Sequence, residues 1–380
     1  AGEHEAYEAE LADRIPMKPW SALGPQAVEA LAGFDGGADP DYVVMHALVD
    51  DGVLYYQPSQ TPRGAYPYPE RMRFGVWSIT KSVGPGLGML RLAQKYGDWV
   101  FDLELIDYLP IDPPHDGWEG VTFGDALNMA TGLGGGTTDA NPNDMFVDYT
   151  WLGDYVDWYE ARTTEEKIAA LELVDDYPWG PGEVARYRDR DMFALGVAMN
   201  NFLKSVEGDD ADIWRMIAEE VFAPIGIHHA PMNRTFEPDG GLGQPIMAWG
   251  WYPNLGDLAK VAELLHERGR HNGRQLLHPE LTESLFSVEG TLTKGPANAL
   301  KYGVGRYKMG FHYAPFPVDG ETIWLPVMSG YVGNRVVPLP NGMTVIRISN
   351  AWPAPADVVA AVEDPTSMIE AANRLEPFAE

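Results

Sequence analysis

Short apolar runs separated by turn residues occupy both ends of the chain. Residues 42–49 form an apolar, β-branched run, Asp50-Asp51-Gly52 is a turn signal, and residues 53–56 resume the apolar pattern. This arrangement predicts a β-hairpin. The same pattern returns near the C-terminus in the runs 322–328, 335–339 and 343–349, the last two separated by Pro340-Asn341-Gly342. We therefore expect antiparallel strands from both ends of the chain.

The middle of the chain has helical periodicity instead. Apolar residues recur at helical spacing in the segments 123–129, 164–174, 191–203, 213–222 and 255–267, and a last helix is expected at about 356–373. The economical architecture is an α+β fold, in which one antiparallel sheet built from both chain ends is flanked by helices and a mainly helical region is inserted. The expected divisions are an N-terminal extension (1–40), a sheet region (41–95 with 290–380) and the inserted region (96–289).

Composition narrows the possible functions. The 380 residues include 27 Lys and Arg against 56 Asp and Glu, a net charge of −29, and we find no basic patch that would bind nucleic acid. Cysteine is absent, which excludes disulfides, Cys-based metal sites and thiol nucleophiles. No run reaches the roughly 18 to 20 apolar residues of a membrane span. Any catalysis must therefore use hydroxyl, carboxylate, amine or imidazole groups.

The start of the chain bears on its location in the cell. It begins Ala1-Gly2-Glu3, without Met or a hydrophobic targeting segment, as expected of a chain whose signal has been removed or of a trimmed one. A periplasmic or secreted location is slightly favoured over a cytoplasmic one.

One pair of residues offers an activated hydroxyl. Ser78 and Lys81 lie three positions apart directly after the first hairpin, so a helix that begins near Ser78 would place both side chains on one face. A neutral lysine amine could then accept the serine proton, and the helix N-terminus could bind a developing oxyanion. On the pair alone, a helix-capping Ser78 beside a solvated Lys81 is an equal alternative.

The segment Ser78-Ile79-Thr80-Lys81 resembles the S-x-x-K motif of the penicillin-recognising serine hydrolases, nearest to the class C β-lactamase branch with its family VIII esterases and related amide hydrolases. Further segments resemble that family in the expected order, at 121–133, 179–189, 221–227, and 257–265 with 276–280. The resemblance covers roughly residues 40 to 350. It implies a β-lactamase/transpeptidase-like fold and no cofactor.

The resemblance also implies roles for individual residues. Ser78 would be the acylated nucleophile, Lys81 its activating amine, and Tyr187 the phenol that moves protons to the leaving group and from the deacylating water. The backbone N–H groups of Ser78 and Tyr331 would form the oxyanion hole. Residues expected to contact substrate are Trp77, Trp179, Asp189, Trp251, Ser329 and Gly330.

Three departures from the family pattern affect this interpretation. Asp189 stands where the family has Asn, and its carboxylate could hold Lys81 protonated. The third motif is Met328-Ser329-Gly330, which lacks the cation that holds a substrate carboxylate. Gly84-Pro85-Gly86 should kink the nucleophile helix, because proline removes a backbone hydrogen bond.

Aromatic residues favour an apolar substrate. They gather in the inserted region at Trp151, Tyr155, Trp158, Tyr159, Trp179, Trp249, Trp251 and Tyr252. A pocket lined by such residues prefers apolar acyl or alcohol groups.

These observations predict a serine esterase or amidase for a neutral, fairly apolar small molecule, with an acyl-enzyme on Ser78, no metal and no nucleic-acid partner. Two alternatives remain at this stage. One is a β-lactamase or D-alanyl-D-alanine peptidase, and the other is a catalytically silent binding protein of the same fold. The sequence does not indicate the oligomeric state.

Overall fold

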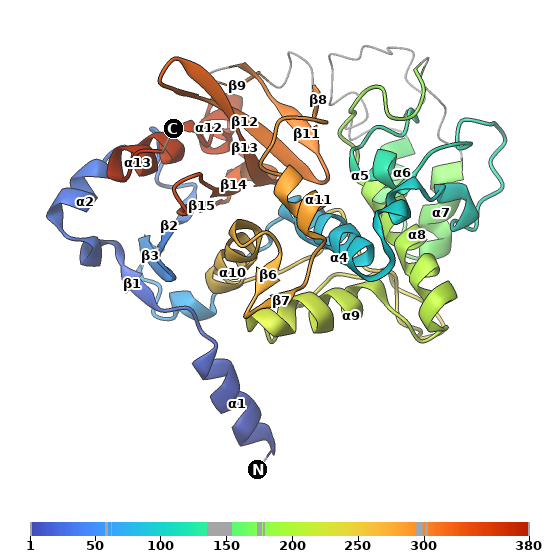
Figure 1. Cartoon of the computed structure of the whole chain (residues 1–380), viewed down its shortest axis with the longest axis horizontal. Coiled ribbons are helices and arrows are strands. Elements are labelled where there is room, and N and C mark those ends of the chain that lie inside the picture. Colours follow the sequence, from blue (N-terminus) through green and yellow to red (C-terminus); the bar gives the residue numbers. More distant parts are fainter. Residues whose placement is uncertain are drawn as a thin grey trace.

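A computed structural model describes residues 2–57, 60–61, 63–134, 154–172, 177, 179–293, 299–300 and 303–378. In these residues the largest sheet has nine strands in the order β1-β3-β2-β15-β14-β13-β12-β11-β8 (Figure 1). The strands are β1 (Met17–Pro19), β2 (Val43–Asp50), β3 (Val53–Gln57), β8 (Leu292–Thr293), β11 (Arg306–Lys308), β12 (Phe311–Val318), β13 (Glu321–Gly330), β14 (Asn334–Pro338) and β15 (Thr344–Ser349). Only β1 pairs with its neighbour in parallel.

The two chain ends meet in the centre of this sheet. Strand β15 pairs antiparallel with β2, and Val345 lies opposite Leu48. The expected hairpin is formed by β2 and β3, and the three expected C-terminal strands correspond to β13, β14 and β15. The predicted antiparallel sheet from both chain ends is confirmed.

One long strand was not predicted. Strand β12 pairs with β13 over seven positions, with Pro315 opposite Trp324. Two prolines, Pro315 and Pro317, interrupt its apolar run, and proline in a run argues against a strand because it cannot donate to the ladder. Pairing with the long strand β13 outweighs this local signal.

Helices cover the sheet and build the inserted region (Figure 1). They are α1 (Gly2–Ala12), α2 (Pro25–Ala30), α3 (Ile79–Lys81), α4 (Leu87–Tyr96), α5 (Phe123–Leu127), α6 (Asp154–Glu160), α7 (Thr164–Glu172), α8 (Asp189–Glu207), α9 (Ile213–Ile217), α10 (Leu255–His266), α11 (Pro279–Ser284), α12 (Ala356–Glu363) and α13 (Thr366–Leu375). The single C-terminal helix expected at 356–373 is wrong. Two helices form there, because Pro365 disfavours helical backbone at Asp364.

Three further pairs of short strands are present among the described residues, in addition to several short 3-10 and π-helical segments. The pairs are β4 (Gln60–Thr61) with β5 (Gly64–Ala65), β6 (Arg270–His271) with β7 (Arg274–Gln275), and β9 (Ala299–Leu300) with β10 (Gly303–Val304). They lie apart from the large sheet.

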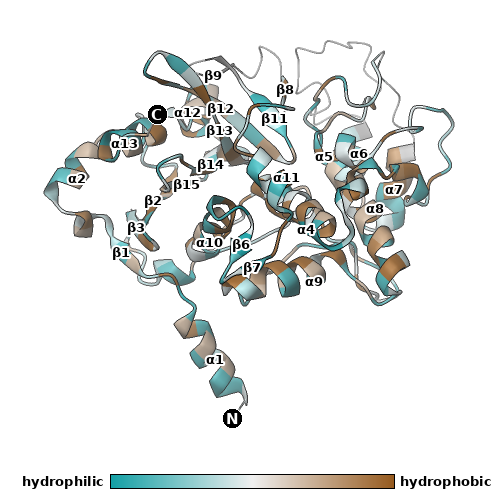
Figure 2. Ribbon diagram, in the orientation of Figure 1, coloured by the Kyte–Doolittle hydropathy of each residue, from teal (hydrophilic) through white to brown (hydrophobic). Residues whose placement is uncertain are grey.

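Two apolar layers enclose the central strands. Ala47 and Ile346 belong to the large core shared with the helical region, whereas the next residues along each strand pack under α13, among them Leu48 and Val345. This alternation is that of strands buried on both faces. The buried hydrophobic residues of α8 and α9 belong to the same large core (Figure 2).

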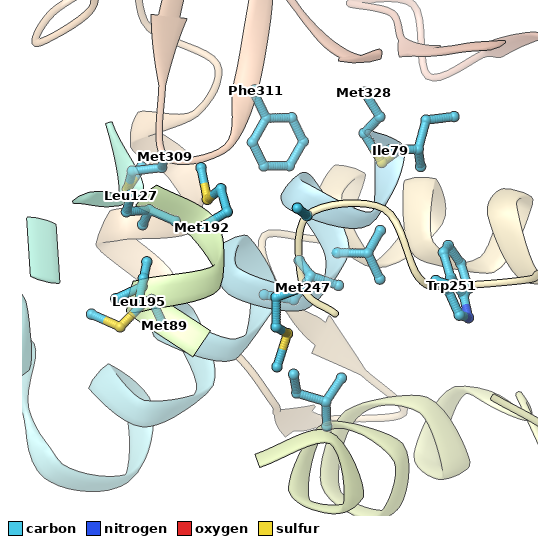
Figure 3. Close-up of a cluster of buried hydrophobic side chains, with 14 of the residues drawn as sticks. Ile79, Met89, Leu127, Met192, Leu195, Met247, Trp251, Met309, Phe311 and Met328 are labelled. Atoms are coloured by element: carbon cyan, nitrogen blue, oxygen red, sulfur yellow. The ribbon is translucent and has the colours of Figure 1, made fainter. Parts of the chain in front are cut away.

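The large core lies directly behind helix α3. Ile79 of α3 packs in the cluster that also contains Met328 of β13, Phe311 of β12 and Met192 of α8 (Figure 3). Sheet and inserted helices therefore share one core beneath Ser78. The division of the chain into three regions stays a prediction.

Helix α1 points away from this body (Figure 1) and buries none of its residues. Within the described residues, none of the helices combines the length and the apolar character needed to cross a bilayer. Trp151 and residues 135–138 of the glycine-rich segment lie outside the described residues.

The burial of His46 on β2 predicts that the stability of the folded protein depends on pH. Burial and the charge of Arg347 lower the pKa of His46 to about 4, although Nδ1 lies 3.4 Å from Gln57 Oε1. The unfolded chain, with a histidine pKa near 6.5, then binds more protons than the folded one between these values. Stability from this group is complete above pH 6.5 and is lost as the pH falls toward 4.

We expect His46→Asn to remove this contribution. Between pH 7 and pH 5 the free energy of unfolding should fall by about 2 kcal/mol less in the variant than in the parent chain. Urea unfolding at both pH values measures this difference. An equal fall in both proteins would contradict the assignment.

Candidate active site

Ser78 lies at a sharp entry into a helix. The preceding Trp77 has a φ of 51°, a left-handed conformation that is uncommon for a bulky residue, and Ser78 itself is already helical. The Ser78 hydroxyl makes no capping hydrogen bond to the helix, and Lys81 is only 1% exposed. The alternative of a helix cap beside a solvated lysine is therefore wrong.

The predicted kink at Pro85 takes another form. Residues Ser82–Gly86 form a π-helical turn between α3 and α4, so the helix continues through Pro85 in a wider hydrogen-bonding pattern. Ser82 inside this turn donates a hydrogen bond to the carbonyl of Gly310, 2.7 Å away. The turn thus ties the nucleophile helix to the sheet side of the molecule.

Three acceptors surround the Lys81 ammonium. Nζ lies 2.7 Å from Ser78 Oγ, 2.5 Å from Asp189 Oδ1 and 2.9 Å from the carbonyl oxygen of Ala248. Each of its hydrogens therefore has a partner. The structure brings together Ser78, Lys81 and Asp189 as the sequence predicted.

The carboxylate of Asp189 is held from a second side. Tyr155 of α6 donates its hydroxyl to Asp189 Oδ2 at 2.9 Å, and both side chains are buried. Asp189 is also the first residue of α8, where the helix dipole favours a negative charge. The tyrosine was noted in the sequence only as an aromatic residue, and nothing in the sequence pattern linked it to Asp189.

Tyr187 completes this buried cluster. Its hydroxyl is within hydrogen-bonding reach of Ser78 and Lys81, and Lys81 Nζ lies 4.8 Å from its ring centroid. The rings of Tyr307 and His312 pack against it at centroid distances of 5.9 and 5.2 Å. These last two residues lie on β11 and β12, which the sequence pattern did not reveal.

The charges and the burial around Lys81 and Tyr187 determine whether each side chain is protonated. Burial alone lowers the pKa of Lys81, but the charge of Asp189 and the hydroxyl of Tyr187 outweigh it, so the pKa lies above its ordinary value. Burial also raises the pKa of Tyr187, although the Lys81 charge acts in the opposite direction. At neutral pH the site therefore contains an ammonium and a protonated phenol.

The C-terminal end of β13 packs against the backbone at Val76, just before Ser78. A Cβ added to Gly330 would lie 2.1 Å from the carbonyl oxygen of Val76, so only glycine fits there. Beyond it, the ring of Tyr331 meets that of Trp77 edge to face at 6.0 Å. Ser329 precedes Gly330 on the same strand.

One cationic side chain, that of Arg335, lies beside the third motif, but its guanidinium is already hydrogen-bonded to backbone carbonyl groups. Buried Arg335 stands opposite Ser329 in the β13–β14 ladder and donates to the carbonyl oxygens of Gly330 (2.6 Å), Asn334 (2.9 Å) and Glu363 (2.8 Å). These contacts use the guanidinium to hold the strand ends together. Nothing in the sequence pattern assigned Arg335 a role.

An aromatic groove of about 510 Å³ opens next to the reactive residues. Its aromatic lining is Phe74, Trp77, Tyr159, Trp249 and Tyr252, joined by Asn233, Asn334 and Asn350. Trp77 directly precedes Ser78, and Trp249 directly follows the Ala248 carbonyl that binds Lys81. Two residues of the groove lining are therefore chain neighbours of residues that belong to the cluster or bind it.

Two other predicted substrate contacts lie elsewhere. Trp251 is fully buried and stacks on Phe222 with ring centroids 5.6 Å apart, within the core cluster of Figure 3. It is therefore unavailable to a ligand, and assigning it to the pocket from sequence is not supported. Trp179 stacks on Tyr177 at 4.5 Å, and Gly132 packs against its carbonyl oxygen. It is not among the residues that line the groove.

Over the described ranges, no three or more His, Asp or Glu side chains are grouped so that they could hold a metal ion. The arrangement is that of a serine hydroxyl with a buried lysine beside it, on a sheet flanked by helices. This fold and site define a serine hydrolase of the penicillin-recognising class.

The comparisons with known proteins agree with this class. The family described as Beta-lactamase matches residues 42–363, and the chain belongs to this family. None of the curated proteins compared with the chain matches it.

Several solved structures share the fold. A suspected 6-aminohexanoate-dimer hydrolase from Bacillus anthracis is 18% identical with a TM-score of 0.67, covering 97% of this chain and 89% of that one. An octameric penicillin-binding protein homologue from Pyrococcus abyssi is 20% identical (TM-score 0.57; 89% and 76% covered). A D-stereospecific amidohydrolase from Streptomyces sp. is 16% identical (TM-score 0.57; 89% and 98% covered).

The close approach of Gly330 to Val76 predicts a steric requirement. We expect Gly330→Ala to push β13 from the nucleophile turn, lowering the free energy of unfolding by about 1 to 3 kcal/mol and reducing the reactivity of Ser78. Gly241→Ala is the control, because there the added Cβ would meet only the flexible end of Asp239. Thermal melts and labelling with a fluorophosphonate probe measure both effects. Equal behaviour of the two variants would contradict this packing role.

Proposed function

We propose that this protein is an esterase or amidase that hydrolyses a neutral, fairly apolar small molecule through an acyl-enzyme on Ser78. The observation that carries the proposal is the 2.7 Å contact between Ser78 Oγ and Lys81 Nζ inside a buried cluster. A hydroxyl needs such a partner to become a nucleophile, because its own proton is too weakly acidic at neutral pH. Tyr187, a phenol within reach of Ser78, is suited to protonate the leaving group.

The oxyanion would form between the helix entry and the end of β13. Backbone N–H groups of Ser78 and Tyr331 are the donors we assign to it. The packing of Gly330 on Val76 supports this assignment, since it brings the strand against the nucleophile turn.

The aromatic groove supports a neutral substrate. Arg73 is the one basic residue among those that line the groove. Its guanidinium donates to Asp257 at 3.2 Å and to the carbonyl of Tyr252 at 2.9 Å. The remaining lining is aromatic, aliphatic or uncharged polar. Such a surface favours apolar groups and does not offset the cost of desolvating a substrate carboxylate.

Amide and ester substrates should both be tested. Two structural neighbours carry names of amide hydrolases, the suspected 6-aminohexanoate-dimer hydrolase and the D-stereospecific amidohydrolase. The missing third-motif cation at Met328 disfavours penicillins and D-alanyl-D-alanine peptides, which present a carboxylate. Turnover of nitrocefin at a rate above that of neutral esters would favour a β-lactamase instead.

The first test removes the nucleophile. We expect Ser78→Ala to lose hydrolysis of p-nitrophenyl butyrate and to take up no fluorophosphonate, because the substitution removes the serine Oγ beside Lys81 and the phenol of Tyr187, the other hydroxyl within reach, stays protonated. Ser82→Ala is the matched control on the same helix, since its hydroxyl bonds only a backbone carbonyl in the described contacts. Steady-state rates and intact mass measure the result. If Ser78→Ala hydrolyses the ester as fast as the parent chain, the proposal fails.

The second test concerns the groove. We expect Trp249→Ala to lower kcat/KM for p-nitrophenyl octanoate by about 10- to 100-fold and to leave p-nitrophenyl acetate nearly unaffected, because only the longer chain reaches the lost aromatic surface. Trp99→Ala, a half-exposed tryptophan that is not among the groove residues, is the control. A uniform loss across both esters in Trp249→Ala would argue that the groove does not bind the acyl chain.

A further inference from the structure

Resting on the proposed function, we infer that Asp189 is the group that finally receives the Ser78 proton. In this arrangement Ser78, Lys81 and Asp189 form a relay, and Lys81 passes a proton instead of keeping one. The aspartate that replaces the family's asparagine thus supports catalysis by this chain.

The contacts form a continuous line. Ser78 Oγ lies 2.7 Å from Lys81 Nζ, and the same nitrogen lies 2.5 Å from Asp189 Oδ1. Tyr155 holds the other carboxylate oxygen at 2.9 Å, so Oδ1 stays directed at the ammonium. Lys81 is 1% and Asp189 3% exposed, so bulk water has almost no contact with either side chain.

Lys81 cannot accept the serine proton on its own. It is an ammonium whose hydrogens already point to Ser78, Asp189 and Ala248, so its nitrogen has no free lone pair. Tyr187 does not replace it, because burial keeps its phenol protonated at neutral pH. Of the described groups in contact with Lys81, the carboxylate of Asp189 is the one with proton-accepting capacity.

The proton steps balance without any further reagent. Lys81 gives one Nζ proton to Asp189 Oδ1, which produces an amine and a carboxylic acid. The freed lone pair takes the proton from Ser78 as Oγ forms a bond to the substrate carbonyl carbon, whose π bond opens to the oxyanion. When the intermediate collapses, a proton from Tyr187 or Lys81 leaves with the alcohol or amine. The Asp189 proton then returns through Lys81.

Other ionisable groups surround the relay and must be considered in any pH profile. Tyr159 of α6, Lys167 of α7 and Tyr307 of β11 each interact electrostatically with Asp189. Arg335 interacts with Tyr187. Burial lowers the pKa of Lys167 to about 8, so this lysine titrates in the working range. A Lys167→Met background separates its titration from that of the relay.

The decisive variant is Asp189→Asn, measured by the rate at which a fluorophosphonate probe labels Ser78 between pH 5 and pH 10. The amide cannot accept a proton, so Lys81 must release its own to solvent before Ser78 reacts. We expect labelling at pH 7 to slow by roughly 100-fold or more, and its rise with pH to move to higher pH. Asp191→Asn, a buried aspartate of the same helix turn that pairs with Arg188, is the matched control for structural damage.

A second variant keeps the Asp189 carboxylate and removes only the tyrosine hydroxyl that donates a hydrogen bond to it. Tyr155→Phe removes a donor from the charged carboxylate, so protonation of Asp189 becomes easier. We expect the acid limb of the labelling profile to move up by about half to one pH unit, and the rate above that limb to stay the same or rise, because Asp189 then accepts the Lys81 proton more readily. A purely structural role of Tyr155 would lower the melting temperature and leave the limb in place.

The outcomes separate the relay from the proposed function. Labelling of Ser78 in the parent chain together with an unchanged or faster Asp189→Asn would overturn the relay and leave the hydrolase intact. No labelling of Ser78 in the parent chain would overturn both. If Asp189→Asn fails to fold, the shift or constancy of the acid limb in Tyr155→Phe decides.

Discussion

Lys81 places a positive charge where almost no water reaches, and three separate segments supply oxygen atoms to it. Ser78 comes from the helix entry, Asp189 from the first turn of α8, and Ala248 from a loop 167 positions away in the sequence. An uncompensated buried ammonium would cost several kcal/mol, so these segments must come together for the fold to be stable. The same contacts that satisfy the charge place the nucleophile.

This requirement explains several local features. Trp77 adopts a left-handed backbone that turns the chain into the helix at Ser78, and the end of β13 approaches so closely that Gly330 has no room for a side chain. Strain at one residue and the loss of a side chain at another are tolerated because the shared core behind Ile79 fixes both elements. The aromatic groove follows from the same junction, since Trp77 and Trp249 are chain neighbours of two members of the cluster.

Asp189 changes what the lysine can do. With a neutral amide at this position, Lys81 would have to lose a proton to solvent before it could act as a base, whereas the carboxylate keeps Lys81 charged and offers a second place for the proton. The placement of Tyr155 on its other oxygen shows that the surrounding structure holds this carboxylate in one orientation. A single residue difference from the family pattern therefore gives Lys81 a charged partner, and the proposed proton relay depends on this partner.

Local patterns in the sequence determined the hairpin at 42–56, most helices of the inserted region and the pairing of Ser78 with Lys81, because each depends on neighbours within a few positions. Family resemblance added Tyr187 and Asp189. Tertiary structure alone decided the rest. The partnership of Tyr155 with Asp189 and the use of the Ala248 carbonyl arise from packing between distant segments. The same holds for the aromatic residues, where Trp249 faces the groove and Trp251, two positions on, is buried, since composition does not specify which side of a loop meets the core.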